Sequence, residues 1–317
     1  MKRILVTGAA GFVGTNFLNR LKNIPDVELV GVFHNKKPVI CADNISYIQA
    51  DLKNFDECRQ IVNNIDYVCA FAGRLSTSAI LAKNPLGPVT ENTIVHTQML
   101  EASFEAGVQK YLWLSSTTGY PLLDRPLKEE DFFASDPPPP YEPAGWVSRY
   151  IEKLAELYVA KHKNAMTVIS LRPTAIFGEH DDFNYETCHS LPALIRRVAE
   201  GHSPVEIWGT GEDARDWLYV DDLIDACLLA LEKIEGYKAL NIGHGKVYNL
   251  NQLVDMLLNI EGQNTRDIIH RLKKVASIFT RRIDCSMAES VIGFRAKTSI
   301  EQALTKTLQW CKGPPKI

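Results

Sequence analysis

The chain has 317 residues, a formal net charge of −3, and 38 acidic against 35 basic residues. This length allows a large core, most simply in two lobes, and the balanced charge excludes the basic face that nucleic-acid binding requires. No apolar run is long enough to span a bilayer, and we expect no membrane association. Seven scattered cysteines without a Cys-x-x-Cys pair, and eight histidines without ligand spacing, predict reduced thiols, a cytoplasmic location and no metal site.

The first predicted element is a buried strand at Ile4–Val6 that leads through a glycine-rich turn into a helix. The three glycines follow the spacing Gly-x-x-Gly-x-x-Gly. Such a turn bends tightly and brings the N–H groups of a helix against a pyrophosphate. The position after a strand and before a helix therefore predicts a dinucleotide site. Its predicted contact residues are Gly8, Gly11, Phe12, Val13 and Gly14.

The second predicted strand, Glu28–Val32, ends without the acidic residue that usually binds the ribose 2′-hydroxyl of NAD. Asn35 and Lys36 follow it, next to Lys37, and these side chains suit a 2′-phosphate through charge-assisted hydrogen bonds. We therefore predict NADP as the cofactor, with NAD as the alternative. A solvated basic turn that binds nothing is the other interpretation of these residues.

Two further segments are predicted to reach the cofactor. Asp51, followed by Leu52, comes after an apolar stretch, where a carboxylate can accept a hydrogen bond from the adenine amino group. The alternative is that Asp51 caps the next helix. The strand Tyr67–Ala72 ends with small residues that allow close approach of a cofactor; the predicted contacts there are Phe71, Ala72 and Gly73.

The strand Lys110–Leu114 ends in three hydroxyl residues: Ser115, Ser116 and Thr117. Hydroxyl groups at the carboxyl edge of a parallel sheet lie in the crevice where ligands bind, although serines can also cap a turn. A further strand is predicted at Thr167–Leu171, and helical spacing occurs at Asn54–Asn64, Glu91–Ala106 and Val147–Lys161. The alternation predicts an α/β fold with a doubly wound parallel sheet of the Rossmann type.

After Pro173 the pattern changes to loops with short helices, such as Leu191–Glu200 and Leu250–Leu258. We predict a dinucleotide-binding domain over residues 1–173 and a smaller substrate-binding lobe over residues 174–317. Part of 216–246 is expected to return to the sheet.

Together these segments resemble the extended short-chain dehydrogenase/reductase family of the NAD-dependent epimerase/dehydratase type, and within it the GDP-fucose synthase-like nucleotide-sugar enzymes. The likeness covers nearly the whole chain. It includes residues 172–178, and its most specific segments are residues 180–184, 189–197, 208–211 and 215–222.

The resemblance implies an NAD(P)-dependent oxidoreductase or epimerase that acts on a nucleoside diphosphate sugar, with GDP favoured and hydride transfer at a sugar carbon, C4 by preference. It implies a role in nucleotide-sugar or surface-polysaccharide biosynthesis and a homodimer formed through two helices of the cofactor domain. Further implied cofactor contacts are Asn92, Ser115, Pro173 and Ile176. Implied substrate contacts are Asn184, His189, Leu191, Arg197, Arg215 and Arg281, with Arg215 and Arg281 on the diphosphate.

One family feature is missing, namely the Tyr-x-x-x-Lys pair that transfers the proton. Counting back from the segment that follows the pair places Ala144 and Ser148 at its two positions, and a shift by one residue gives Gly145 and Arg149. Arg149 is a cation that can hold a ribose, but it cannot deprotonate and act as a base. Tyr150 is turned by about 240° from position 144 and is expected to face elsewhere.

Tyr141, just before the helix, is one candidate to replace the missing tyrosine, and Thr117, or a water held by Thr117 and Ser116, is the other. The predicted catalytic residues are thus Thr117, Ser116, Tyr141 and Arg149. Two interpretations stay open. The protein is an enzyme with an atypical acid or base, or it is a catalytically impaired regulatory protein that binds cofactor and sugar nucleotide.

Overall fold

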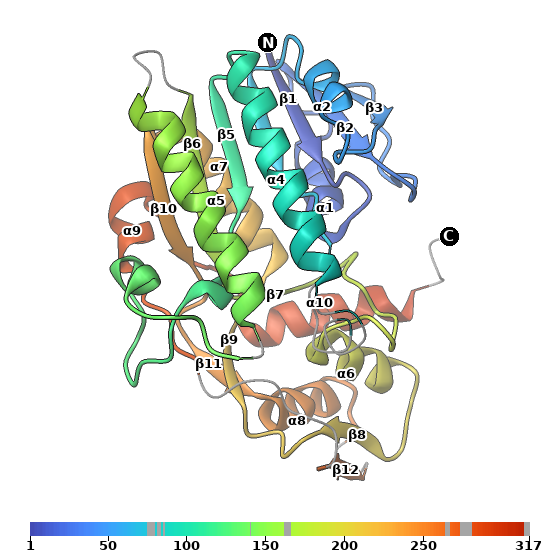
Figure 1. Ribbon diagram of the computed structural model, residues 1–317. Coiled ribbons are helices and arrows are strands. Elements are labelled where there is room, and N and C mark those ends of the chain that lie inside the picture. The colour runs from blue at the N-terminus through green and yellow to red at the C-terminus, as the bar shows by residue number, and fades with distance from the viewer. Residues whose placement is uncertain are drawn as a thin grey trace.

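The computed structural model describes residues 1–74, 80, 84, 86–139, 141–161, 166–263, 267–272 and 281–313. Within these residues the larger lobe is built on a parallel sheet of seven strands in the order β10-β6-β5-β4-β1-β2-β3 (Figure 1). The strands are β1 (Lys2–Thr7), β2 (Val27–Phe33), β3 (Ile45–Gln49), β4 (Tyr67–Ala70), β5 (Lys110–Leu114), β6 (Thr167–Pro173) and β10 (Tyr237–Ile242). This order confirms the predicted doubly wound sheet.

Helices cover both faces of this sheet, which is why its strands are continuous apolar runs rather than alternating ones. One face packs against α2 (Phe55–Ile61), α4 (Gly87–Glu105) and α5 (Glu142–Lys161). The other face packs against α1 (Phe12–Leu21), α7 (Val220–Lys233) and α9 (Ser286–Ile292). Every residue of β6 is buried, as expected for a central strand between two helical layers.

The smaller lobe has its own apolar core between three helices and short strands. The helices are α6 (Ser190–Ala199), α8 (Leu250–Ile260) and α10 (Ile300–Lys312). Around them lie a three-stranded sheet of β11 (Val247–Asn249), β9 (Ala214–Tyr219) and β7 (Ala175–Phe177), and a parallel pair of β8 (Val205–Trp208) and β12 (Ile268–Arg271). The chain crosses between the lobes more than once, because α7 and β10 return to the large sheet.

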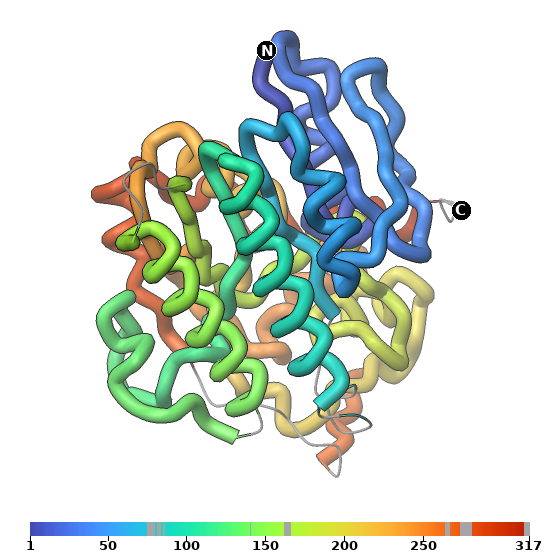
Figure 2. The backbone as a smooth tube through the Cα atoms, turned by 45° about the horizontal axis from the view of Figure 1, so that its top comes forward, coloured from blue at the N-terminus to red at the C-terminus, as the bar shows by residue number. Residues whose placement is uncertain are grey.

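The smaller lobe lies beyond the carboxyl ends of the large sheet, toward which the arrow of β5 points in Figure 1. Figure 2 shows the same two parts from a second direction. In a sheet of this type the crevice outside the carboxyl ends of the strands is where ligands bind. In the described part of the chain, no helix combines the length and apolar character needed to cross a membrane.

Candidate functional site

The glycine-rich turn joins β1 to α1 at the carboxyl edge of the seven-stranded sheet. Gly8 has a φ of +66°, and a Cβ atom placed on it would lie 2.8 Å from the backbone nitrogen of Ala72. A Cβ on Gly14 would lie 2.2 Å from the carbonyl oxygen of Gly8. The packing of the protein itself therefore requires these two glycines.

Gly11 differs from them because it is exposed, and a Cβ atom on it would meet only the carbonyl oxygen of Gly8, at 3.1 Å. It is the N-cap residue of α1, and no side chain caps that helix. The first N–H groups of a helix have no partner within it, and the helix dipole favours a negative group there. The open, uncapped start of α1 thus fits the pyrophosphate of a dinucleotide.

The loop after β4 is held by two polar side chains. Thr7 accepts a hydrogen bond from the backbone N–H of Ala72 at 3.0 Å. The amide of Asn92 accepts from the backbone N–H of Arg74 at 2.7 Å and donates to the Arg74 carbonyl at 3.1 Å. Asn92 therefore fixes the loop that contains Gly73. The side chain of the predicted contact Phe71 packs on Phe17, with ring centroids 5.2 Å apart.

The residues predicted to select the cofactor lie after β2 and β3. Asn35 and Lys36 are exposed, and Leu52 is buried. Asp51 accepts from the backbone N–H of Lys53 at 3.0 Å and so forms a turn before α2. It does not cap that helix, because the cap is Asn54.

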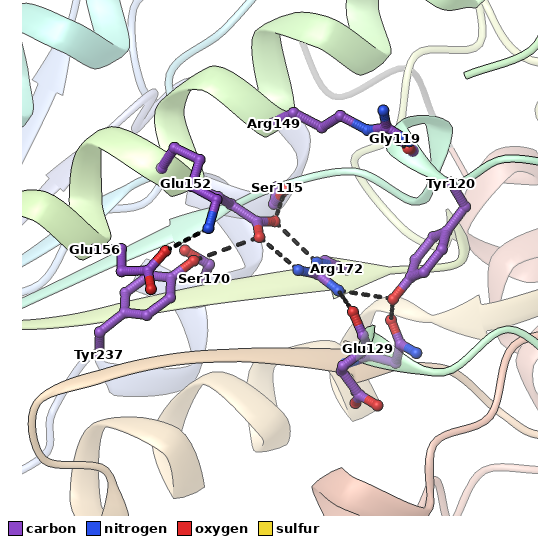
Figure 3. Close-up of polar contacts among 12 residues, drawn as sticks. Ser115, Gly119, Tyr120, Glu129, Arg149, Glu152, Glu156, Ser170, Arg172 and Tyr237 are labelled. Atoms are coloured by element: carbon purple, nitrogen blue, oxygen red, sulfur yellow. Dashed lines mark hydrogen bonds and ion pairs between the residues drawn. The ribbon is translucent and has the colours of Figure 1, made fainter. Parts of the chain in front are cut away.

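A buried ion pair joins α5 to β6 next to this edge (Figure 3). Arg172 donates through Nε and Nη2 to the two carboxylate oxygens of Glu152, at 2.9 and 2.5 Å. Ser115 donates to the same carboxylate at 2.6 Å, and Arg172 donates to the Tyr120 hydroxyl at 2.8 Å. The hydroxyl of Ser115, predicted to face the cofactor, therefore belongs to this network. Glu152 lies on the buried face of α5, and a buried charge requires a partner. This glutamate is therefore the feature of the sequence that could have indicated the network.

The structure gives Arg149 a different role from the predicted one. Its Nε donates to the carbonyl of Gly119 at 2.9 Å, and its Nη2 donates to the carbonyl of Ser135. The guanidinium thus holds the loop before α5 (Figure 3) and is not directed as a substitute for the family lysine. Ser148, at the other candidate position, donates to the carbonyl of Ala144 at 3.3 Å.

Ser116 and Thr117, which follow β5, differ in whether their hydroxyl groups are used within the protein. Ser116 accepts from the backbone N–H and the hydroxyl of Thr118, at 3.2 and 2.9 Å, and so caps the short 3₁₀ helix η1 (Thr117–Gly119). Thr117 is half-buried, and its carbonyl accepts from Nη1 of Arg281 at 2.5 Å. Its own hydroxyl forms no hydrogen bond with any residue that the structure describes.

Arg281 and Arg215 lie side by side, because their backbones form an isolated parallel bridge. The guanidinium of Arg281 is buried, and its Nε and Nη2 atoms have no hydrogen-bond partner among the described residues. Burial, and next the charge of Arg215, lower the pKa of Arg281 to about 10, while the nearby phenols of Tyr141 and Tyr120 act in the opposite direction. The unsatisfied buried donors of Arg281, next to the second positive charge of Arg215, are suited to an anion.

His189 lies close to this pair. It is the N-cap residue of α6, and although part of its surface is exposed to solvent, desolvation by the surrounding protein and the charge of Arg215 lower its pKa. Leu191, also predicted to touch the substrate, has a completely buried side chain in the core of the smaller lobe. Any contact with a ligand would have to come from its backbone. Asn184 is exposed in the preceding loop, and its side chain accepts from the backbone N–H of Glu186.

The structure thus brings Thr117, Tyr141, His189, Arg215 and Arg281 together from both lobes. Of the other predicted contacts, Pro173 ends β6 and is buried, and Ile176 is half-buried in β7. In the described ranges no group of three or more His, Cys, Asp or Glu side chains is placed to hold a metal ion.

Comparison with known proteins identifies the family of this chain. The model of the NAD dependent epimerase/dehydratase family matches residues 4–243. GDP-L-fucose synthase 1 of Arabidopsis thaliana is 28% identical over 318 residues, which cover 97% of this chain and 92% of that protein. The solved UDP-glucose 4-epimerase of Thermotoga maritima with UDP-glucose superposes with a TM-score of 0.85 at 25% identity, over 97% of this chain and 98% of that one. MoeE5 in complex with UDP-glucuronic acid and NAD gives a TM-score of 0.83 at 26% identity, over the same shares. The chain therefore belongs to the NAD dependent epimerase/dehydratase family.

Proposed function

We propose that the protein is an NAD(P)-dependent oxidoreductase or epimerase that acts on a nucleoside diphosphate sugar, with GDP favoured and hydride transfer at a sugar carbon, C4 by preference. The observation that carries this proposal is the unsatisfied side of the buried Arg281 guanidinium beside Arg215. A guanidinium fork matches the oxygens of a diphosphate, which would supply the missing acceptors.

The glycine-rich turn is the proposed cofactor site, with Gly11 and the start of α1 at the pyrophosphate. The bound dinucleotide would supply the hydride acceptor or donor. We propose NADP, with Asn35 and Lys36 at the 2′-phosphate; NAD is the alternative, and the related MoeE5 structure contains it. A comparison of the dissociation constants of NADP and NAD tests this choice, and tighter binding of NAD would contradict it.

Proton transfer is the step for which this chain lacks the family pair. Thr117 is held to Arg281 through its carbonyl, which leaves its hydroxyl for a water or for the sugar hydroxyl. The phenol of Tyr141 lies within electrostatic reach of the same guanidinium. Tyr141 in its phenolate form would accept the proton of the sugar hydroxyl, or a water oriented by Thr117 would carry that proton to solvent, and the same route would return it in the reverse direction. Arg281 would stabilise the negative charge that develops on oxygen.

The test is turnover. The protein is mixed with oxidised or reduced cofactor and a panel of GDP- and UDP-sugars, while the absorbance of reduced nicotinamide is followed and the sugar products are separated by chromatography. The chromatography is needed because an epimerase leaves no net change in the cofactor. A new sugar, or a change in absorbance, that depends on the protein supports the enzyme.

The second candidate is a regulatory protein that binds both ligands without turnover. It is favoured by Ala144 and Ser148, which replace the family pair, and by Arg149, whose guanidinium is held by the loop before α5. Tight binding of cofactor and sugar nucleotide without product, for every sugar tried, would support this candidate and contradict the enzyme.

We also propose a homodimer in the cytoplasm. Trp146, Tyr150 and Leu157 of α5 are exposed, and their spacing places them on one side of the helix. Tyr150→Glu would convert a dimer to a monomer in sedimentation, and a wild-type monomer would refute this interface.

The proposed cytoplasmic location is supported by the seven cysteines, which are all free thiols. Localisation of a tagged chain in cells tests it.

A further inference from the structure

His96 of α4 is a half-buried histidine whose Nδ1 atom is buried without a hydrogen-bond partner among the described residues. Its ring packs on Trp113 of β5, with ring centroids 5.2 Å apart. The indole N–H of Trp113 donates to the hydroxyl of Ser170 at 2.7 Å, which fixes the surface against which His96 lies. Packing therefore orients the His96 ring, and no polar group in the described part of the chain explains why a histidine stands there.

The other ring nitrogen, Nε2, faces the loop after β4. A Cβ atom on Gly73 would lie 3.8 Å from Nε2 of His96 and 3.4 Å from Oδ1 of Asn92. Asn92 lies one helical turn before His96 and fixes this loop through its two hydrogen bonds with the backbone of Arg74. Because Gly73 is exposed and has no side chain, a bound group can approach Nε2 across the glycine.

The charge of the ring limits what it can bind. Burial lowers the pKa of His96 to about 4, so the ring is neutral near pH 7 and carries one proton. A buried N–H group without an acceptor is rarer in proteins than a buried acceptor without a donor. The proton is therefore best placed on Nε2, where it faces the loop. A neutral N–H donor suits a hydroxyl oxygen, whereas a phosphate would favour a cation.

The strand order indicates which part of a dinucleotide would meet this donor. β1 and its glycine-rich turn lie between β4 and β2. Asn35 and Lys36, proposed to select the cofactor, follow β2 and so lie on the adenosine side of the pyrophosphate. His96 lies on the opposite side, where it contacts β5 and faces the loop after β4. A dinucleotide with its pyrophosphate at the start of α1 therefore brings its second ribose, which carries the nicotinamide, toward His96.

The α5 residues that stand at the positions of the missing family pair are used within the protein. Ser148 donates to the carbonyl of Ala144, and Arg149 holds the loop before the helix. α4 packs beside α5 on the same face of the sheet (Figure 1), and it carries His96. A ribose contact from α4 would therefore replace one that these α5 residues do not provide.

We propose that Nε2 of His96 donates a hydrogen bond to a hydroxyl group of the nicotinamide-side ribose and so positions the dinucleotide. The inference rests on the proposed function, because it assigns one contact of the same cofactor.

The experiment measures dissociation constants by calorimetry at neutral pH. The ligands are the preferred dinucleotide and its fragment without the second ribose, which is ADP for NAD and 2′-phospho-ADP for NADP. His96→Met and His96→Gln introduce side chains of similar length, and both lose the ring, but only glutamine keeps an N–H near the position of Nε2. We expect His96→Met to weaken the dinucleotide about 3- to 10-fold, the usual effect of losing one hydrogen bond between uncharged groups. His96→Gln should keep most of the affinity, and the fragment should change less than about twofold in both variants.

The unfolding temperature distinguishes this contact from a purely structural role. Methionine places no unpaired polar atom against Trp113, so His96→Met should be at least as stable as His96→Gln. The order of dinucleotide affinity should be the reverse. The matched control is Tyr111→Phe, because Tyr111 lies two residues before Trp113 on the same face of β5 and its buried hydroxyl also has no partner among the described residues. This variant should leave both affinities unaltered.

An unchanged dinucleotide affinity in His96→Met would overturn the assignment, as would an equal loss in His96→Gln. An equal loss for the fragment would also overturn it, because His96 would then support the loop rather than bind the ribose. In each of these cases the wild-type protein still binds its cofactor, and the proposed function stands. If the wild-type protein binds neither NAD nor NADP, the proposed function itself fails.

Discussion

Two arginines near the carboxyl edge of the sheet, Arg172 and Arg281, both have buried guanidinium nitrogen atoms, and they differ in what surrounds those atoms. Arg172 donates to both oxygens of Glu152, to the hydroxyl of Tyr120 and to the carbonyl of Glu129. Arg281 donates to the carbonyl of Thr117, and two of its nitrogen atoms have no partner in the described part of the chain.

The pKa values express the same difference. Burial by itself would lower the pKa of Arg172, but the hydrogen bond and charge of Glu152 outweigh it and raise the pKa above its usual value. For Arg281 nothing comparable offsets burial and the repulsion of Arg215, so its pKa falls to about 10. The fold thus supplies the hydrogen-bond acceptors of Arg172, whereas Arg281 keeps donors that a ligand is suited to bind. The following predictions test whether Arg172 serves stability and Arg281 serves ligand binding.

The largest effect is expected from Arg172→Met, which leaves the buried Glu152 carboxylate without its charged partner. Removing one member of a buried pair costs about 3–5 kcal/mol of unfolding free energy, measured by urea denaturation. The double variant Arg172→Met with Glu152→Leu should recover much of this loss, because neither charge remains. A single variant as stable as the wild type would show that the pair is not structural.

Thr117→Val keeps the carbonyl that anchors Arg281 and removes only the hydroxyl. We expect turnover to fall by roughly 10²–10⁴, the usual effect of losing a positioned proton-transfer group, with cofactor binding intact. The control is Tyr141→Phe. If it abolishes turnover and Thr117→Val does not, then Tyr141 is the acid and base.

Arg281→Met should behave in the opposite way to Arg172→Met. Nucleotide binding should weaken by about 2–4 kcal/mol, because a charged donor of the diphosphate is lost, and Arg215→Ala should have a similar effect. The unfolding free energy of Arg281→Met should stay the same or rise, since an incompletely paired buried charge is removed. Normal binding of GDP and UDP by both variants would remove the pair from the site.

The smallest effect concerns Asp181, whose buried Oδ2 atom has no hydrogen-bond partner among the described residues and whose pKa burial raises to about 7. The folded protein then holds a proton that the unfolded chain releases near pH 4, so stability falls as the pH rises from about 4 to 7. Asp181→Asn should be about 1–2 kcal/mol more stable than the wild type at pH 8 and equal to it at pH 4. Parallel denaturation curves at the two pH values check this, and an identical pH dependence of both proteins would contradict it.

The sequence predicted the large sheet well, because its strands are long apolar runs separated by helical spacing. The short strands β7, β8, β11 and β12 were not predicted, since three or four residues carry no periodic signal. Helix α5 also begins earlier than the predicted start at Val147.

Side-chain directions in the site were harder to predict than the elements that carry them. The hydroxyl of Ser115 and the guanidinium of Arg149 were expected to face ligands, but both bind parts of the protein. Their partners, Glu152 and the carbonyls of the loop before α5, come close only through packing between distant segments. The adjacency of Arg215 and Arg281 was implied by family resemblance, whereas the unsatisfied donors of Arg281 appear only in the folded chain.

The close packing of α5 on η1 limits how this lineage can change. A Cβ atom on Gly145 would lie 2.7 Å from the Cβ of Pro137 and 2.8 Å from the carbonyl oxygen of Thr118. A tyrosine could not appear there by mutation without displacing the helix. Ala144 and Ser148 already carry Cβ atoms, so a tyrosine and lysine pair could be introduced at those two positions, whereas the packing around Gly145 excludes a tyrosine in the shifted register with Gly145 and Arg149.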